Sequence, residues 1–375
     1  MNSAKPDVCF VSSLTLPESP DPAVKNRWEK LAHDYHLHVI CFSSSKSGWI
    51  TKWGAKFFFI PATPPFFVRV FLYYFLTPFV VSKLLVQRKI EVLIAQSVYE
   101  AGAVVIPKLL ISPFAKTKLV VEAHGDWIES MVILRNITIG KRWFKNILKL
   151  YSKLIFLFAD GARSVSNSTR ALINQFISSD IPHETFPAYM DLNPFFEAAK
   201  LDSHPYNQPY IMYAGALTYL KGVDVLIKSF AQIADVYPDL SLVIAGRGNN
   251  RDDFEQLCDD LKISEQVLFT GYLSKQSLAR TMAGAQLFVL PSQKEGYGRV
   301  LIEAMASKTT VLATQTAGAE EIINQSRSGI LVETNDVQAL TKNIKKLMED
   351  HELRRKLSER GHHYAAVDFE HGSFF

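Results

Sequence analysis

Two glutamates, eight residues apart, enclose the stretch of this sequence that is best suited to chemistry. Glu295 lies in a predicted loop, Glu303 lies in a helix predicted to begin near Arg299, and Gly296 and Gly298 stand between them. Glycine lets a backbone approach a ligand closely. The first N–H groups of a helix have no partner within it and carry partial positive charge. The stretch therefore predicts an anion-binding site with two carboxylates beside it.

Strands and helices must alternate to place this loop. An apolar run at 285–290 predicts a buried strand that leads into it. Further strands are predicted at 210–215, 240–246 and 267–271. In the first half, predicted strands at 92–96 and 118–123 flank a predicted helix at 101–110. This alternation predicts a doubly wound parallel sheet, whose ligands gather at the carboxyl ends of the strands.

The sequence Glu-Gly-Tyr-Gly-Arg-Val-Leu-Ile-Glu, from Glu295 to Glu303, resembles the paired-glutamate motif of retaining glycosyltransferases of the GT-B fold. It is most similar to glycosyltransferase family 4. The resemblance is specific over residues 210–335 and diffuse over residues 1–200. It implies an α/β fold of the GT-B type, in which two Rossmann-like doubly wound domains face each other across a cleft.

The length of 375 residues is sufficient for two such domains. We expect an N-terminal, acceptor-side Rossmann-like domain over residues 1–196. A polar stretch with two prolines predicts a linker over 197–209. The nucleotide-sugar-binding Rossmann-like domain is expected over 210–375.

The resemblance also implies the reaction and the site. A sugar would pass from a nucleotide diphosphate sugar to an acceptor hydroxyl with its anomeric configuration retained. Glu295 would bind the donor sugar, Glu303 the ribose hydroxyls and Lys221 the diphosphate. His124, directly after a predicted strand at 118–123, would face the donor sugar, so the expected catalytic residues are Glu295, His124 and Lys221. The expected donor-binding residues are Gly215, Lys221, Gly246, Arg247, Tyr272, Leu273, Glu295, Gly296, Tyr297, Gly298, Val300, Leu301 and Glu303.

One expected cation is absent from this sequence. Relatives usually carry an arginine directly after the first glycine of the phosphate loop, where this chain has Ala216. We expect Lys221 and the helix start, or another basic residue, to take its place. No Asp-x-Asp occurs in a strand-end loop, which predicts a metal-independent enzyme with no cofactor besides its donor substrate.

The charge is unevenly divided along the chain. Residues 1–200 hold 23 Lys and Arg against 15 Asp and Glu, and the remainder holds 18 against 22. A basic first half predicts an anionic partner, and without a nucleic-acid-binding module we favour a membrane surface. The apolar stretch 66–86 predicts a buried helix pair broken at Pro78, or an interfacial membrane contact. The amphipathic, basic helix at 142–158 predicts a core helix with a solvated face, or a second membrane contact.

The start of the chain lacks a signal-peptide pattern, and three separated cysteines suit a reducing compartment. We therefore expect a cytoplasmic protein, peripheral at the cytoplasmic face of a membrane, with a glycan or lipid-linked acceptor and a role in polysaccharide or lipid-glycan synthesis. A dehydrogenase is excluded, because Arg251 stands where the third glycine of a dinucleotide fingerprint belongs. Two alternatives remain open: a nucleotide-sugar epimerase of the same fold, and a catalytically silent partner of a membrane glycan complex.

Overall fold

The computed structural model describes residues 5–18, 22–88, 90–111, 116–134, 140–185, 190–201 and 205–369. They form two compact units, Met1–Tyr189 and Met190–Phe375. The structure moves the expected boundary at residue 196, because helix α7 (Asn193–Ala198) buries Phe195 and Phe196 in the core of the second unit. The beginning of the expected linker is therefore part of a packed helix.

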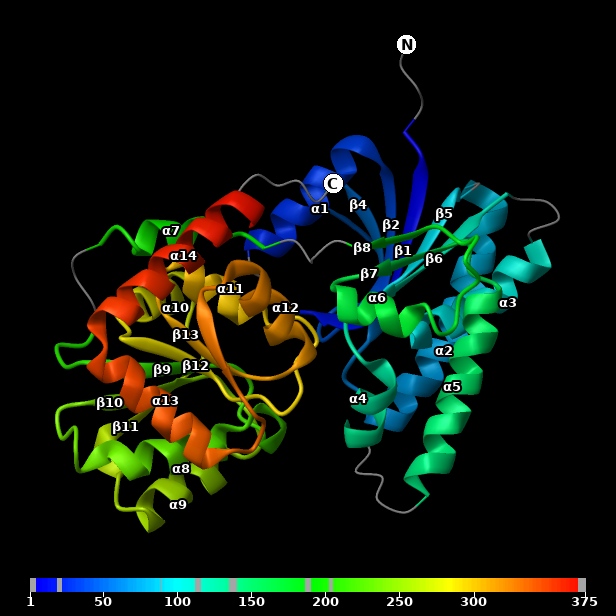
Figure 1. The fold of residues 1–375 in the computed structure, drawn as a ribbon. Helices are drawn as coiled ribbons and strands as arrows, with labels where there is room; N and C mark the ends of the chain where they lie inside the picture. The colour runs from blue at the N-terminus through cyan, green and yellow to red at the C-terminus, as the bar shows by residue number, and fades with distance from the viewer. Residues whose placement is uncertain are drawn as a thin grey trace. The chain divides into compact units, whose positions relative to one another are not determined.

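The first unit is built on an eight-stranded sheet with the strand order β3-β4-β2-β1-β5-β6-β7-β8, parallel except for β3 at one edge (Figure 1). The order reverses between β1 and β5, where a doubly wound sheet binds ligands. The strands are β1 (Asp7–Leu16), β2 (His36–Ser43), β3 (Gly48–Lys52), β4 (Ala55–Pro61), β5 (Val92–Ala95), β6 (Lys118–Ala123), β7 (Gly161–Ser164) and β8 (His183–Thr185). The helices are α1 (Pro22–Asp34), α2 (Phe66–Arg88), α3 (Val98–Ile111), α4 (Trp127–Leu134), α5 (Lys141–Leu157) and α6 (Asn167–Ile173).

Alternate residues of the first sheet enter two cores, because successive side chains of a strand point to opposite faces. Val8 and Phe10 of β1 pack with Trp28 of α1 on one face. Cys9 and Val11 pack on the other face, where α2, α3 and α5 lie side by side. Both faces are covered, which explains why the strands of this sheet are apolar throughout.

Helix α2 is continuous, which corrects the expected break at Pro78. It is long and apolar enough to cross a membrane by length and composition, and a third of that stretch is buried within the unit. Its inner side chains, at helical spacing, belong to the core; they include Tyr73, Val80, Val81, Leu84 and Leu85. Its outer face carries four exposed phenylalanines, four residues apart: Phe67, Phe71, Phe75 and Phe79. The helix is therefore a core helix of the first unit with one apolar face left uncovered.

The second unit has a six-stranded parallel sheet in the order β11-β10-β9-β12-β13-β14, the Rossmann arrangement. The strands are β9 (Tyr210–Ala214), β10 (Ser241–Ala245), β11 (Val267–Gly271), β12 (Leu287–Leu290), β13 (Val311–Thr314) and β14 (Gly329–Val332). The helices after α7 are α8 (Val223–Ala234), α9 (Arg251–Asp260), α10 (Lys275–Ala283), α11 (Arg299–Ala306), α12 (Ala317–Ser326), α13 (Val337–Glu349) and α14 (His351–Phe369). Helices α8, α9 and α13 lie on one side of the sheet, and α7, α10, α11 and α14 lie on the other (Figure 1).

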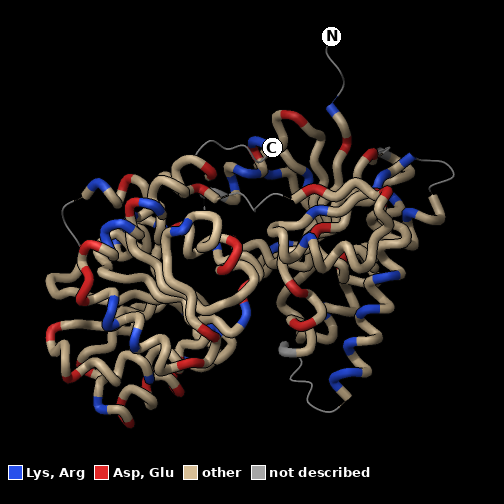
Figure 2. Tube along the Cα trace, viewed as in Figure 1, with Lys and Arg blue, Asp and Glu red and all other residues tan. Residues whose placement is uncertain are grey.

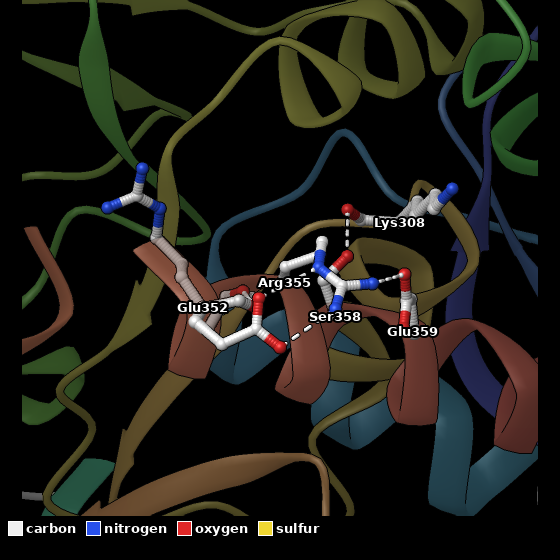
Figure 3. A network of polar contacts seen from close by, with 7 residues as sticks. Lys308, Glu352, Arg355, Ser358 and Glu359 are labelled. Carbon is white, nitrogen blue, oxygen red and sulfur yellow. Dashed lines mark hydrogen bonds and ion pairs between the residues drawn. The ribbon is translucent and has the colours of Figure 1, made fainter. Parts of the chain in front are cut away.

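Two separate helices end the described part of the chain, since Asp350 lies between α13 and α14. Helix α14 packs against α11, and Ser358 Oγ donates to the carbonyl of Lys308 at 2.6 Å, just beyond the end of α11 (Figure 3). On its exposed side Arg355 bonds to Glu352 and Glu359, one turn away in each direction. Helix α14 thus supports the helix on which Glu303 lies.

Candidate functional site

The loops that follow β9 and β12 lie side by side, at the point where the strand order of the second sheet reverses. The backbone N–H of Gln293 donates to the carbonyl of Leu220 at 2.9 Å. Gly222 has a φ of 66°, and a Cβ atom there would lie 2.0 Å from the carbonyl oxygen of Pro291. A side chain at position 222 would force the loops apart, so glycine is required. The two loops predicted to share a ligand are thereby fixed against each other.

Lys221 and Glu295 form an ion pair between these loops. Lys221 Nζ lies 2.7 Å from Glu295 Oε2, and the two side chains are 26% and 17% exposed. Beneath them the Tyr213 hydroxyl donates to the carbonyl of Ala216 at 2.9 Å. Burial raises the pKa of Tyr213, and the charge of Glu295 raises it further. The pair is therefore partly shielded from water while its charged ends stay accessible to a ligand.

Helix α11 begins directly after this pair. Its first turn follows Gly298, which has φ 79° and ψ 39°, and no side chain caps it. The backbone N–H of Gly318 donates to the carbonyl of Glu295 at 3.2 Å, and a Cβ atom on Gly318 would lie 2.6 Å from Tyr297 Cα. Glu303 follows one turn into the helix and is half-buried. The start of α11 thus adjoins the Lys221–Glu295 pair, since a Cβ atom on Gly298 would lie 3.5 Å from Glu295 Cγ, and Glu303 lies one turn further along the helix. This arrangement is suited to a phosphate with hydroxyl groups beside it.

The loop after β10 adds a second cation. Leu217 N donates to the carbonyl of Arg247 at 2.9 Å, so Arg247 lies across from the chain segment that includes Ala216. Gly246 has a φ of 143°, and its Cβ would lie 1.8 Å from the carbonyl oxygen of Gly215. The Arg247 guanidinium lies 5.7 Å from the ring centre of Tyr272, which is 68% exposed. A cation–π contact of this kind positions the arginine beside an open aromatic surface.

Most residues expected to bind the donor lie on these loops of the second unit. The loops carry Gly215, Lys221, Gly246, Arg247, Tyr272, Leu273, Glu295, Gly296, Tyr297 and Gly298, with Val300 and Glu303 on α11. Leu301 is a correction: its side chain is fully buried in the core, and its N–H donates to the carbonyl of Gly298 at 2.8 Å. It lies on the inner face of α11 and supports the site without facing a ligand.

His124 lies in the first unit, at the end of β6, with a side chain that is 47% exposed. Its Nε2 lies 3.4 Å from Glu122 Oε2, and Glu122 Oε1 accepts from Arg163 Nη1 at 2.5 Å. Burial alone would raise the pKa of Glu122, but the His124 hydrogen bond and the Arg163 charge outweigh it and lower that pKa. That His124 faces a donor sugar held by the second unit stays a prediction.

The sequence analysis missed Glu122 and Arg163. They are paired by strand register, β6 residue 122 lying beside β7 residue 163. Two opposite charges near the ends of two short strands are the signal that identifies such a pair. Among the described residues, no group of three or more His, Cys, Asp or Glu could hold a metal ion.

Comparison with known proteins gives one family match. Residues 197–364 match the family model described as glycosyl transferases group 1. The lipopolysaccharide core biosynthesis glycosyltransferase LpsE of Rhizobium meliloti (strain 1021) is 31% identical over 44% of this chain and 47% of its own length. The chain matches less than half the length of this relative and of two further curated relatives.

Two solved structures resemble both units. Sucrose-phosphate synthase from Thermosynechococcus elongatus matches with a TM-score of 0.78 and 18% identity, over 97% of this chain and 95% of that one. HepE of Anabaena, solved in complex with UDP-glucose, matches with a TM-score of 0.72 and 16% identity over 97% of this chain and 95% of that one. At these identities the likeness concerns the fold, and it confirms the expected α/β architecture with two Rossmann-like domains.

Proposed function

We propose that this chain, whose second unit is a glycosyl transferases group 1 domain on a GT-B fold, moves a sugar from a nucleotide diphosphate sugar to an acceptor hydroxyl with retained configuration. The observation that carries the proposal is the Lys221–Glu295 pair, seated where the strand order reverses and next to the start of α11. A doubly wound sheet binds nucleotides at this position.

In this proposal the second unit holds the donor. Lys221 and the N-terminus of α11 bind the diphosphate. Arg247 supplies the positive charge that relatives usually have as an arginine at the position of Ala216. Tyr272 and the backbone near Leu273 border the base. Glu303 accepts hydrogen bonds from the ribose hydroxyls, because a carboxylate offers only acceptors.

The chemical step breaks the bond between the anomeric carbon and the diphosphate oxygen and joins that carbon to the acceptor oxygen. Negative charge develops on the departing phosphate, where Lys221 and the α11 N-terminus stabilise it. These groups supply positive charge without a metal ion. A donor phosphate oxygen takes the acceptor proton, Glu295 binds the donor sugar, and His124 contacts the sugar from the first unit.

We further propose that the first unit works at an anionic membrane surface, on the cytoplasmic side, with a glycan or lipid-linked acceptor. Helix α5 carries Lys149 and Lys153 exposed, and Figure 2 shows the basic residues along it. Helices α2, α3 and α5 also expose large apolar side chains, among them Phe71, Leu110 and Leu154. Basic residues near anionic lipid each contribute about 1 kcal/mol, and apolar side chains enter the headgroup region.

A thermal-shift screen with UDP- and GDP-sugars, followed by product analysis, tests the function. A donor at 100 times its dissociation constant stabilises the protein by about 2.7 kcal/mol. We expect one donor class to raise the melting temperature and sugar to appear on an added lipid-linked acceptor. Epimer or free nucleotide formed without any acceptor would support the epimerase instead, and donor binding without any turnover would indicate a silent partner.

A further inference from the structure

The first unit contains a cavity of about 680 Å³ that none of the expected site residues lines. Ser13 near the end of β1 and Ser97 in the loop after β5 both border it, so it lies where the first sheet reverses its strand order. Apolar and aromatic side chains make up most of its wall, including Phe42, Val70 and Tyr99. The cavity is therefore suited to a ligand with a substantial apolar part.

A buried carboxylate stands in this wall. Glu100 of α3 is 6% exposed, and its Oε1 accepts hydrogen bonds from both the backbone N–H and the hydroxyl of Ser13. Among the described residues none bonds to its other oxygen, Oε2. The order Ser97-Val98-Tyr99-Glu100 is that of a capping box, whose glutamate usually bonds back to the first residue of the motif. Here Glu100 bonds instead to Ser13 near the end of β1, which leaves one carboxylate oxygen for a further donor.

Two more polar groups of the cavity wall also have no hydrogen-bond partner among the described residues. They are the hydroxyl of Tyr73, which is 3% exposed, and Nε of Arg69. Burial raises the pKa of Tyr73 well above its ordinary value, and the Glu100 charge adds to this, so the hydroxyl keeps its proton. Leaving a buried polar group without a partner costs about 1–3 kcal/mol. Three such groups in one cavity indicate a polar ligand.

The three groups together fit hydroxyl groups. Glu100 Oε2 accepts, Arg69 donates, and the Tyr73 hydroxyl can do both. A sugar or polyol offers donors and acceptors side by side, whereas a cationic head group would meet Arg69 in the same cavity. Aromatic rings provide the apolar surface for the carbon skeleton and its attached chain.

The cavity also continues into the apolar face of α2. Phe66, Val70 and Tyr74 line it, while Phe67 and Phe71 of the same helix point outward and are exposed. A chain leaving the cavity would therefore run onto the surface proposed to meet the membrane. A lipid is the ligand whose polar head and apolar tail match both parts.

We propose that this cavity binds the hydroxyl-bearing head group of a membrane lipid, with Glu100 Oε2 accepting a hydrogen bond from a head-group hydroxyl and the apolar tail leaving along α2. The assignment of this lipid as the acceptor rests on the proposed transferase function. Glu100, Tyr73 and Arg69 are positioning residues in this scheme, since they hold the acceptor and take no part in bond formation.

The test is calorimetric titration of the full chain with octyl glucoside below its micelle concentration, beside glucose and octylammonium. We expect octyl glucoside to bind and both other probes to bind at least tenfold more weakly. Glu100→Ala and Val70→Trp should each weaken octyl glucoside binding at least tenfold. Tyr73→Phe, which removes a single unpaired oxygen atom, should weaken it severalfold. Phe79→Ser is the matched control, because it alters the outer face of α2 without lining the cavity.

The proposal would be overturned if octyl glucoside does not bind, or if octylammonium binds more tightly than octyl glucoside. It would also be overturned if the Tyr73→Phe and Val70→Trp variants bind octyl glucoside as tightly as the wild-type chain. A titration with the nucleotide sugar, which binds the second unit, separates this result from the proposed function. If the cavity variants bind both the nucleotide sugar and octyl glucoside as the wild-type chain does, the result counts against the cavity assignment and leaves the proposed function untouched. Failure of the wild-type chain to bind any nucleotide sugar counts against the transferase, while the octyl glucoside titration still decides the cavity.

Discussion

Lys221 and Glu295, 74 positions apart in the sequence, meet with 2.7 Å between Nζ and Oε2. The sheet order brings them together, since the loops after β9 and β12 are neighbours although two strands separate β9 from β12 along the chain. Each residue holds the other in a fixed position before a ligand arrives. A diphosphate at the α11 N-terminus would then find Lys221 already directed toward it.

Lys221→Ala should lower kcat by about 100- to 1000-fold, the effect typical of losing one group that stabilises charge in the transition state. Donor affinity should fall less, because the charge on the phosphate grows as the bond breaks. Initial rates of nucleotide release measure this. Lys228→Ala, which removes a lysine paired with Asp224 on α8, is the matched control. Equal rates in the two variants would remove Lys221 from the site.

Glu303→Ala should act mainly on donor binding. A hydrogen bond to a charged group contributes about 1.5–3 kcal/mol, so we expect the donor dissociation constant to rise by roughly 10- to 100-fold. Calorimetric titration with the donor gives this value directly. Glu295→Gln, which keeps the shape of the loop, should instead reduce turnover. Unchanged donor affinity in Glu303→Ala would contradict the ribose assignment.

Arg247→Ala should weaken binding of the nucleotide diphosphate, because Arg247 is proposed to replace the cation missing at Ala216. The loss should decrease with added salt, since exposed charges are screened. Arg251→Ala is the control: Arg251 lies near the same loop, but it bonds to Glu255 and packs over Phe269. If Arg251→Ala weakens binding as strongly as Arg247→Ala, the effect is one of general charge and the assignment fails.

Glu122 makes the first unit sensitive to acid. Its pKa is lowered in the folded state from an ordinary value of 4.5. Its contribution to the free energy of unfolding is therefore present above pH 4.5 and is lost as the pH falls through the lower folded value. Glu122→Gln should reduce stability by about 2 kcal/mol at pH 7 and by less at pH 3.

Chemical denaturation of both proteins at several pH values measures this difference. Glu29→Gln is the comparison within the same unit, because Glu29 is exposed and its pairing with Lys25 is long, at 3.7 Å. A stability difference between wild type and Glu122→Gln that does not change between pH 7 and pH 3 would show that ionisation of Glu122 does not matter.

Membrane binding should depend on α5. Lys149→Glu combined with Lys153→Glu should weaken binding to anionic vesicles by about 2 kcal/mol or more, and neutral vesicles should bind little protein. Lys145 is less suitable for this test, because it bonds to Glu129. Lys342→Glu with Lys346→Glu, at the same spacing on α13 of the second unit, is the matched control. Co-sedimentation at low and high salt measures vesicle binding by both double variants. Equal binding by the two would show that α5 has no special part in membrane contact.

Sequence patterns were sufficient for the elements around the proposed donor site. β11 begins and ends at the expected residues, and α11 begins at Arg299, since apolar periodicity and glycine positions are local signals. The expected helix break at Pro78 was wrong because long-range packing outweighed a local signal. A proline disfavours a helix locally, but the inner face of α2 packs into the first core on both sides of it.

The sequence alone determined which residues could do chemistry: Glu295, Glu303 and the glycines between them can be named from their types and spacing, and Lys221 from the family resemblance. Only the tertiary structure decided which of them meet. The Lys221–Glu295 pair, the approach of Arg247 to the Ala216 segment and the Glu122–Arg163 pair each depend on strand order or register. The cavity around Glu100 is lined by residues of two strands, three helices and the loop after β5, and no local sequence pattern predicts this, because long-range packing brings them together.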